Sequence, residues 1–237
     1  MRQTDEKFLN ALNVIRCVDK NKIEAAIEYI NSQSSRNWLE DAIFLCGLNE
    51  TASKVNQDEL IRLPGTIKLY ECKGDSNKIT SEIKSRLEER LCLKIGAKIM
   101  VTVNNRNEGY YNGNIGHIKE LGEDVVKIIF SDGKEVVMGR MDFQFSAMDK
   151  NGEIVNYHIY QFPIRLAYAV TIHKSQGMTF ERVNLDPYVW AAGQLYVALS
   201  RVKNIKGLYL SRKIESKYIV ENGIVKTFYS RINIAAA

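Results

Sequence analysis

A run of small, apolar residues in the carboxyl half of the chain leads directly into polar residues that could bind an anion. Residues 167–172 have the composition of a strand that is buried on both faces of a parallel sheet. The residues that follow are His173, Lys174, Ser175, Gln176 and Gly177. Their side chains can donate hydrogen bonds, Lys174 adds positive charge, and Gly177 permits a sharp turn or a close approach of backbone to a ligand. Because open α/β sheets bind ligands beyond the carboxyl ends of their strands, the pattern predicts an anion site here, with an ordinary polar loop as the alternative.

A second cationic residue follows soon after this stretch. Residues 193–202 have helical periodicity, and one face of the helix carries Leu195, Ala198, Leu199 and Val202. Arg201 lies off this apolar stripe, near the helix end, so we expect it to be free to reach a ligand or a partner. The alternative is a surface arginine that interacts favourably with the carboxyl end of the helix.

Alternating helices and strands surround these residues and predict an α/β fold. Helices are expected from Thr4 or Asp5 to about residue 15, at 22–31, around 52–60 and at 78–90, and strands at 42–46, 66–71, 183–186 and 207–210. Between 97 and about 160 the pattern changes to short β-rich runs, with hairpin signals at Asp132-Gly133 and Asn151-Gly152. This stretch predicts a small β-barrel that interrupts the α/β unit.

Composition limits the class of protein. The 237 residues include 33 Lys and Arg against 28 Asp and Glu, so the net charge of +5 is compatible with a nucleic-acid partner without requiring one. The four cysteines form no CxxC pair and the three histidines are scattered, so we expect reduced thiols and propose no metal site. No apolar run reaches the roughly 18 residues that span a membrane, and we expect a cytoplasmic protein that has no membrane partner.

The two motifs together resemble a known family. TIHKSQGMTF (171–180) followed by GQLYVALSRV (193–202) is similar to the last two motifs of superfamily-one DNA helicases of the Pif/RecD-like, 5′-to-3′ branch. Arg2-Gln3 resembles the "RQ" element that opens the second RecA-like domain of these helicases. LCGLNETASKVNQDELIRLPG (45–65) resembles the next segment, and GAKIMVTVNNRNEGYYNGNIG (96–116) resembles the entry to their Src-homology-3-like insert.

The resemblance implies a RecA-like parallel sheet with an inserted Src-homology-3-like β-barrel. It places RecA-like domain 2A at residues 1–96 plus 159–237 and the insert, domain 2B, at 97–158. It also implies that Arg201 is an arginine finger, that Arg2 is a second γ-phosphate sensor, and that Gln176 and Gly177 lie against the nucleotide.

The implied DNA-binding residues fall in three groups. Thr171, His173, Lys174 and Ser175 would face the DNA backbone or couple it to the nucleotide. Asn56 stands at the family's asparagine. The polar, aromatic turn of the β module would add Asn104, Asn105, Tyr111 and Asn112, for which an ordinary surface loop is the alternative.

The chain departs from the family in one respect: it contains no GxxxxGK[ST] phosphate loop and no matching Mg²⁺ carboxylate. We therefore expect the second half of a motor, either a cloned fragment or a truncated gene product. ATP and Mg²⁺ would bind to the full-length parent and neither to this chain alone. The expected partners are single-stranded DNA and the N-terminal RecA-like domain of the same protein, and the expected state is a monomer.

Two other readings stay open. One is a stand-alone single-strand-binding or regulatory module without ATPase activity, and the other is a structural α/β scaffold whose motifs are accidental. Arg201 together with Gln176 favours the motor, because a pure DNA-binding module has no need of a γ-phosphate arginine.

Overall fold

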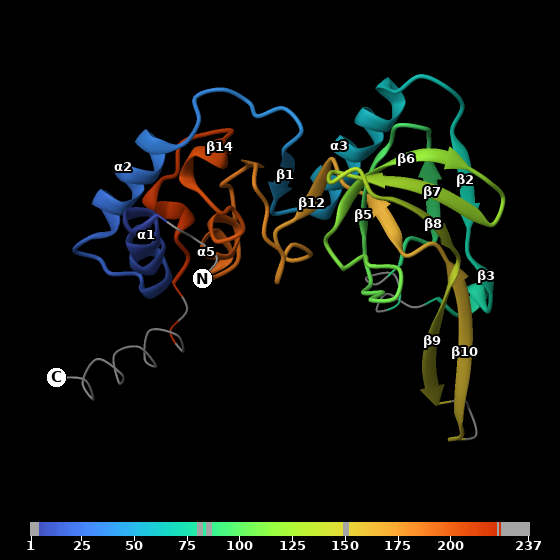
Figure 1. The fold of residues 1–237 in the computed structure, drawn as a ribbon. Coiled ribbons are helices and arrows are strands. Elements are labelled where there is room, and N and C mark those ends of the chain that lie inside the picture. Colours follow the sequence, from blue (N-terminus) through green and yellow to red (C-terminus); the bar gives the residue numbers. More distant parts are fainter. Residues whose placement is uncertain (1–4, 80–82, 84–86, 149–151, 222, 224–237) are drawn as a thin grey trace. The chain divides into compact units, whose positions relative to one another are not determined.

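A computed structural model describes residues 5–79, 83, 87–148, 152–221 and 223. The chain divides into two compact units, which we call unit 1 (Met1–Val55 with Tyr168–Ala237) and unit 2 (Asn56–Ala167). Unit 1 is therefore discontinuous in sequence. Helix α3 (Asn49–Arg62) contains the first boundary between the two units (Figure 1).

Unit 1 is built on a parallel sheet with the strand order β12-β1-β13-β14. The strands are β1 (Ile43–Cys46), β12 (Ala169–Thr171), β13 (Val183–Leu185) and β14 (Leu208–Leu210). In β1, Leu45 pairs with Val170 on one side and Leu185 on the other. All residues of β12 and β13 are buried, which confirms the strands expected from these apolar runs.

Helices α1 (Glu6–Cys17), α2 (Ile23–Gln33) and α5 (Gln194–Leu199) belong to the same unit. The amide of Phe8 donates to Oδ1 of Asp5 over 3.1 Å, so Asp5 is the N-cap of α1. Helix α1 packs on α2, and each buries the apolar stripe that its spacing predicts, Phe8, Leu12 and Ile15 in α1 and Ala26, Ile27 and Ile30 in α2. Short 3-10 turns occur at Ile205–Gly207 and Ser216–Tyr218.

Unit 2 is rich in antiparallel strands. Its largest sheet has the order β11-β5-β6-β7-β8, with β5 (Lys98–Val101), β6 (Ile115–Leu121), β7 (Val125–Phe130), β8 (Glu135–Gly139) and β11 (Ile164–Leu166). The other sheets are β3-β10-β9 and β2-β4, made of β2 (Lys68–Glu71), β3 (Lys73–Gly74), β4 (Arg90–Leu93), β9 (Met141–Met148) and β10 (Ile154–Gln161). Both predicted hairpins, β7–β8 and β9–β10, are confirmed.

Unit 2 is longer than the β module expected from sequence. Tyr70 of β2 and Leu91 and Leu93 of β4 share one core with Ile99 and Ile118 of the large sheet, so residues before 97 pack with this unit. The boundaries 97–158 for a separate insert stay a prediction.

The prediction of a helix at 78–90 is wrong at both ends of that range. A 3-10 turn occupies Ser76–Lys78, and Arg90 already begins β4, which pairs antiparallel with β2. Much of the remaining range lies outside the described residues. Leu91 and Leu93 point into the core through tertiary pairing with β2, a contact between distant segments that the local charge pattern does not reveal.

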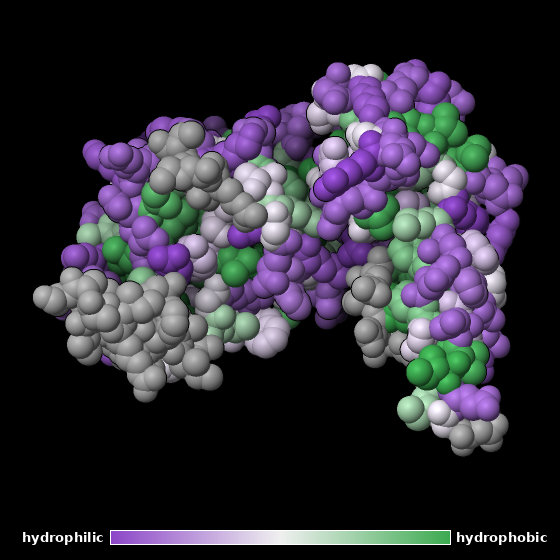
Figure 2. Space-filling model, turned by 60° about the horizontal axis from the view of Figure 1, so that its bottom comes forward, coloured by the Kyte–Doolittle hydropathy of each residue, from purple (hydrophilic) through white to green (hydrophobic). Residues whose placement is uncertain are grey.

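The β9–β10 hairpin extends away from the rest of unit 2 in Figure 1. Met148 and Ile154 lie opposite each other near its end and are 72% and 74% exposed, which accounts for the apolar area at that end in Figure 2. In the described part of the chain, every helix is too short or too polar to cross a bilayer.

The close fit around Gly116 gives a test of the packing in unit 2. A Cβ at this position would lie 2.7 Å from Cγ2 of Ile128 and 2.8 Å from the carbonyl oxygen of Ile129. We expect Gly116→Ala to lower the free energy of unfolding by about 1–3 kcal/mol, because the well-packed sheet must shift to admit the methyl group. Urea denaturation followed by circular dichroism measures this change.

Gly139→Ala is the matched control, because the nearest atom to its Cβ, the carbonyl oxygen of Asp124, is 3.9 Å away. It should be neutral or stabilise by up to about 1 kcal/mol. Equal effects of the two substitutions would contradict the packing described for β6.

Candidate functional site

The carboxyl ends of the parallel strands meet at one edge of the sheet in unit 1. The amide of Ile172, just beyond β12, donates to the carbonyl of Cys46 at the end of β1 over 2.9 Å. On the other side of β1, the amide of Asp186 donates to the carbonyl of Leu45 over 2.9 Å. The segments that follow β12 and β13 therefore flank the end of β1, as the rule for open α/β sheets predicts.

The turn after β12, residues 172–177, is closed by its own hydrogen bonds. The hydroxyl of Ser175 donates to the carbonyl of Ile172 over 2.7 Å, and the amide of Ser175 donates to the carbonyl of Thr171 over 3.1 Å. Gly177 has a φ of 84°, a left-handed conformation that glycine adopts without strain. The turn therefore has one defined shape, with His173, Lys174, Gln176 and Gly177 exposed.

Two of the four residues expected to face the DNA backbone or to couple it to the nucleotide are turned inward. Ser175 is fully buried and Thr171 is 6% exposed. Oγ1 of Thr171 accepts a hydrogen bond from the amide of Lys174 over 3.4 Å. Both side chains shape the turn, and a direct contact between either of them and DNA would require the turn to open.

Arg201 is buried rather than free, which corrects the expectation from the helical wheel. Its side chain is held by hydrogen bonds from Nε to the carbonyl of Val197 (2.9 Å), from Nη1 to the carbonyl of Met178 (3.1 Å) and from Nη2 to Oγ of Ser200 (2.8 Å). The reason for the error is that α5 ends at Leu199, so Arg201 lies past the helix, where the chain turns back towards Met178.

Backbone contacts reinforce this link between the two motifs. The amide of Phe180 donates to the carbonyl of Arg201 over 2.8 Å, and the amide of Lys203 donates to the carbonyl of Phe180 over 3.1 Å. The end of the first motif is thus joined to the end of the second by main-chain and side-chain bonds. We therefore expect a displacement of either segment to shift the other.

In unit 2, several polar side chains of the polar, aromatic turn accept hydrogen bonds from the backbone of the turn itself. Oδ1 of Asn104 accepts from the amide of Asn112 over 2.9 Å, and Oδ1 of Asn105 accepts from the amides of Asn107 and Glu108 over 3.1 and 3.2 Å. Nζ of Lys134 also donates to the carbonyl of Gly109 over 3.0 Å. Tyr111 is 49% exposed, so its ring is accessible to a ligand.

The structure says less about the roles of two other predicted site residues, Asn56 and Arg2. Asn56 lies in α3 and is half-buried. Arg2 lies outside the described residues, so its role as a γ-phosphate sensor stays a prediction.

The electrostatics at the sheet edge exclude a reactive thiolate at Cys46. Burial raises the pKa of this thiol to about 11, with a smaller contribution from the nearby Asp186 carboxylate and against the lowering effect of its hydrogen bond to the Leu48 backbone. Cys46 is therefore protonated near pH 7. Asp186 itself accepts from the amide of Tyr188 over 3.2 Å and pairs with Nε of Arg212 at 3.1 Å.

Sequence reasoning missed two aromatic residues in the segment after β13. Tyr188 and Trp190 are 52% and 65% exposed beside the end of β1. The signal that could have found them is a pair of aromatics within a short loop between a buried strand and a glycine-initiated helix.

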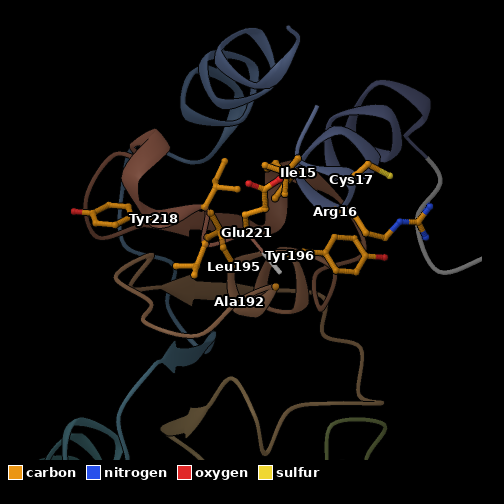
Figure 3. A pocket seen from close by; sticks show the side chains of 12 residues that line it. Ile15, Arg16, Cys17, Ala192, Leu195, Tyr196, Tyr218 and Glu221 are labelled. Carbon is orange, nitrogen blue, oxygen red and sulfur yellow. The ribbon is translucent and has the colours of Figure 1, made fainter. Parts of the chain in front are cut away.

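A separate hollow in unit 1 lies between the end of α1 and the start of α5 (Figure 3). It is lined by residues that include Ile15, Leu195 and Tyr218, and the guanidinium of Arg16 lies 5.9 Å from the ring centre of Tyr196. Among the described residues, none of those predicted for the site lines this hollow. It is therefore distinct from the sheet edge.

The residues at the sheet edge fit a phosphate better than a metal ion. Nothing lies within 4 Å of where a Cβ of Gly177 would be, so an anion can approach this backbone, and Gln176 and Lys174 are exposed beside it. Within the described ranges, no three His, Cys, Asp or Glu side chains are grouped so that they could hold a metal. The edge can therefore contribute donors and positive charge to an anion.

The closure of the turn by Ser175 can be tested directly. We expect Ser175→Ala to lower the free energy of unfolding by about 1 kcal/mol, because the hydroxyl bond to Ile172 is lost in a buried position. Hydrogen exchange of residues 172–178 should become faster. His173→Ala, at an exposed position of the same turn, should change stability by less than about 0.5 kcal/mol. Unchanged exchange in Ser175→Ala would show that the turn does not depend on this bond.

Comparisons with known proteins agree with the two motifs. The ATP-dependent DNA helicase Pif1 of Campylobacter jejuni is 34% identical over 93% of this chain and 54% of its own length. The helicase PIF1 of Danio rerio is 31% identical over 98% of this chain and 37% of its own length. No protein-family model matches the chain.

Solved structures give the same result. Bacteroides sp. Pif1 in complex with ADP-AlF4 is similar with a TM-score of 0.78 and 28% identity, over 99% of this chain and 55% of that one. Bacteroides Pif1 bound to ssDNA is similar with a TM-score of 0.74 and 28% identity, over 100% of this chain and 56% of that one. The chain thus spans about half the length of the Campylobacter relative and of these structures, and about a third of the Danio relative. The chain therefore fits the carboxyl-terminal half of a Pif1-like DNA helicase.

Proposed function

We propose that this chain is the second RecA-like part of an ATP-dependent helicase that translocates on single-stranded DNA. It would supply the arginine finger, the residues that couple nucleotide to DNA, and part of the DNA track. The relatives are ATP-dependent DNA helicases, and one similar structure is bound to ssDNA. The observation that carries the proposal is the bond between the Arg201 guanidinium and the carbonyl of Met178, because it joins the two motifs at one point.

At the nucleotide, Arg201 would stabilise the charge that develops on the γ-phosphate, and Arg2 would be a second sensor. ATP would supply the phosphoryl group, and Gln176 and Gly177 would lie against it. Arginine suits this role because its planar, permanently charged fork matches phosphate oxygens. A bond from Arg201 to an anionic oxygen is stronger than its bond to the neutral Met178 carbonyl, so a phosphate oxygen would compete with that carbonyl for Nη1.

At the DNA, the exposed His173 and Lys174 would contact phosphates, while Thr171 and Ser175 hold the turn in shape. Asn56 would contribute from α3. In unit 2, the ring of Tyr111 would stack on a base, and Asn104, Asn105 and Asn112 would form its support. This division of roles follows from which side chains are exposed and which are already bonded.

The rest of the motor would come from an N-terminal RecA-like domain that holds the phosphate loop and Mg²⁺. Part of unit 2, residues 97–158, would be the Src-homology-3-like insert, and the protein would act as a monomer. A stand-alone DNA-binding module is not favoured, because it has no use for Arg201 beside the 172–178 segment.

The purified chain should show no ATP hydrolysis above background, with or without single-stranded DNA, because it has no GxxxxGK[ST] loop to hold the phosphates. A coupled assay of ADP release measures this. Hydrolysis that persists after further purification would contradict the assignment.

The role of Arg201 can be tested in a protein that carries this chain behind a phosphate-loop domain. Arg201→Ala should reduce ATP turnover by about 10³- to 10⁵-fold while ATP binding stays within a few-fold, because an arginine finger acts on the transition state. Arg182→Ala, an exposed arginine of the same unit, is the control and should leave turnover unchanged. Equal turnover in the two variants would remove Arg201 from the reaction.

A further inference from the structure

The loop after β13 exposes two large aromatic side chains at the sheet edge. Trp190 is 65% exposed, Tyr188 is 52% exposed, and Leu48, the residue before α3, is 47% exposed. A single exposed apolar residue needs no explanation, but adjacent large ones indicate an interaction surface. We call Leu48, Tyr188 and Trp190 the aromatic edge.

The aromatic edge stands over the end of β1. A Cβ placed on Gly47 would lie 3.1 Å from the carbonyl oxygen of Tyr188 and 3.8 Å from Cδ1 of Trp190. Strand β1 has β13 on one side and β12 on the other, so the exposed His173 and Lys174 follow a strand about 10 Å from β13. The aromatic edge and these two residues therefore lie at the same carboxyl end of the sheet. Their separation is short enough for one single strand of a few nucleotides to contact both.

The loop that carries the aromatic edge is held in place before any ligand binds. Oε1 of Gln194 accepts from the amides of Trp190 and Ala191, each over 3.3 Å. Asp186 accepts from the amide of Tyr188, whose ring makes an edge-on contact with Tyr218 at 6.0 Å between centres. A ligand that stacks on these rings would lose little affinity to loop ordering.

We propose that Trp190 is a stacking platform for a base of single-stranded nucleic acid, with Tyr188 beside it, and that it extends the DNA track across the end of β1. This inference rests on the proposed function. Flat, rigid, exposed indole suits a base because every base has a π-face, so binding would have no sequence preference. The guanidinium of Arg212, which pairs with Asp186 through Nε, lies 6.0 Å from the centre of the Tyr188 ring, and its side chain is 54% exposed, so we expect it to be within reach of a backbone phosphate beside Tyr188.

The chain contains only two tryptophans, and this makes the test direct. Trp38 packs against Phe44 and Tyr209, with 5.7 Å between ring centres in each pair. The variant Trp38→Phe leaves Trp190 as the sole tryptophan, and Trp190→Phe leaves Trp38. Titration with a short oligothymidylate at low ionic strength should quench the fluorescence of the first variant and leave that of the second unchanged.

Affinity gives an independent measurement. Trp190→Ala should weaken oligothymidylate binding by roughly 5- to 100-fold, the loss expected for one stacked base, and Trp190→Phe should stay within a few-fold of the parent. An abasic sugar–phosphate oligomer should bind the parent chain and Trp190→Ala equally, because it has no base to stack. This comparison separates stacking from a general effect on the charged surface.

The outcomes distinguish this inference from the proposed function. If oligothymidylate binds but leaves Trp190 fluorescence and the affinity of Trp190→Ala unchanged, the stacking platform is wrong and the DNA track stands. The aromatic edge would then be a surface for a neighbouring protein domain. If oligothymidylate does not bind at all at low ionic strength, the DNA track of this chain is wrong, and the platform with it.

Discussion

The structure of unit 1 depends on the pairing of β1 with parallel strands on both sides. Leu45 pairs with Val170 and with Leu185, so stretches separated by more than a hundred residues in the chain become neighbours. Because all the strands run the same way, their carboxyl ends share one edge, and every polar segment that follows a strand emerges there. The 172–177 turn, Gly47 and the loop at 186–193 are brought together by this single constraint.

The second feature is the connection between the ends of the two motifs. Phe180 exchanges backbone bonds with the segment at 201–203, and Arg201 donates to Met178. Arg201 is bonded to the segment that directly follows the exposed His173 and Lys174. We therefore expect a shift of Arg201 to move this segment, and a shift of the segment to move Arg201. In the proposed motor, this bonded connection would link the arginine at the phosphate to the residues at the DNA.

Many polar residues in both units are used to build the turns. Thr171 and Ser175 close the turn after β12, and Asn104 and Asn105 accept from backbone amides of their own loop. Buried or loop-forming polar groups must find partners, so some polar residues of each segment serve only to shape the turn. Among the predicted and proposed contacts, the exposed rings are those of Trp190, Tyr188 and Tyr111.

The sequence by itself determined the strands of the parallel sheet, the helices α1 and α2, the hairpins of unit 2 and the two motifs, because these follow from local periodicity, caps and turn residues. Only the tertiary structure decided that Arg201 is buried against Met178, that Ser175 points inward, that residues 90–93 pair with β2, and that Trp190 stands exposed over Gly47. Each of these depends on contacts between segments that are distant in the chain. Burial is set by what packs against a side chain, and no local pattern of residue types contains that information.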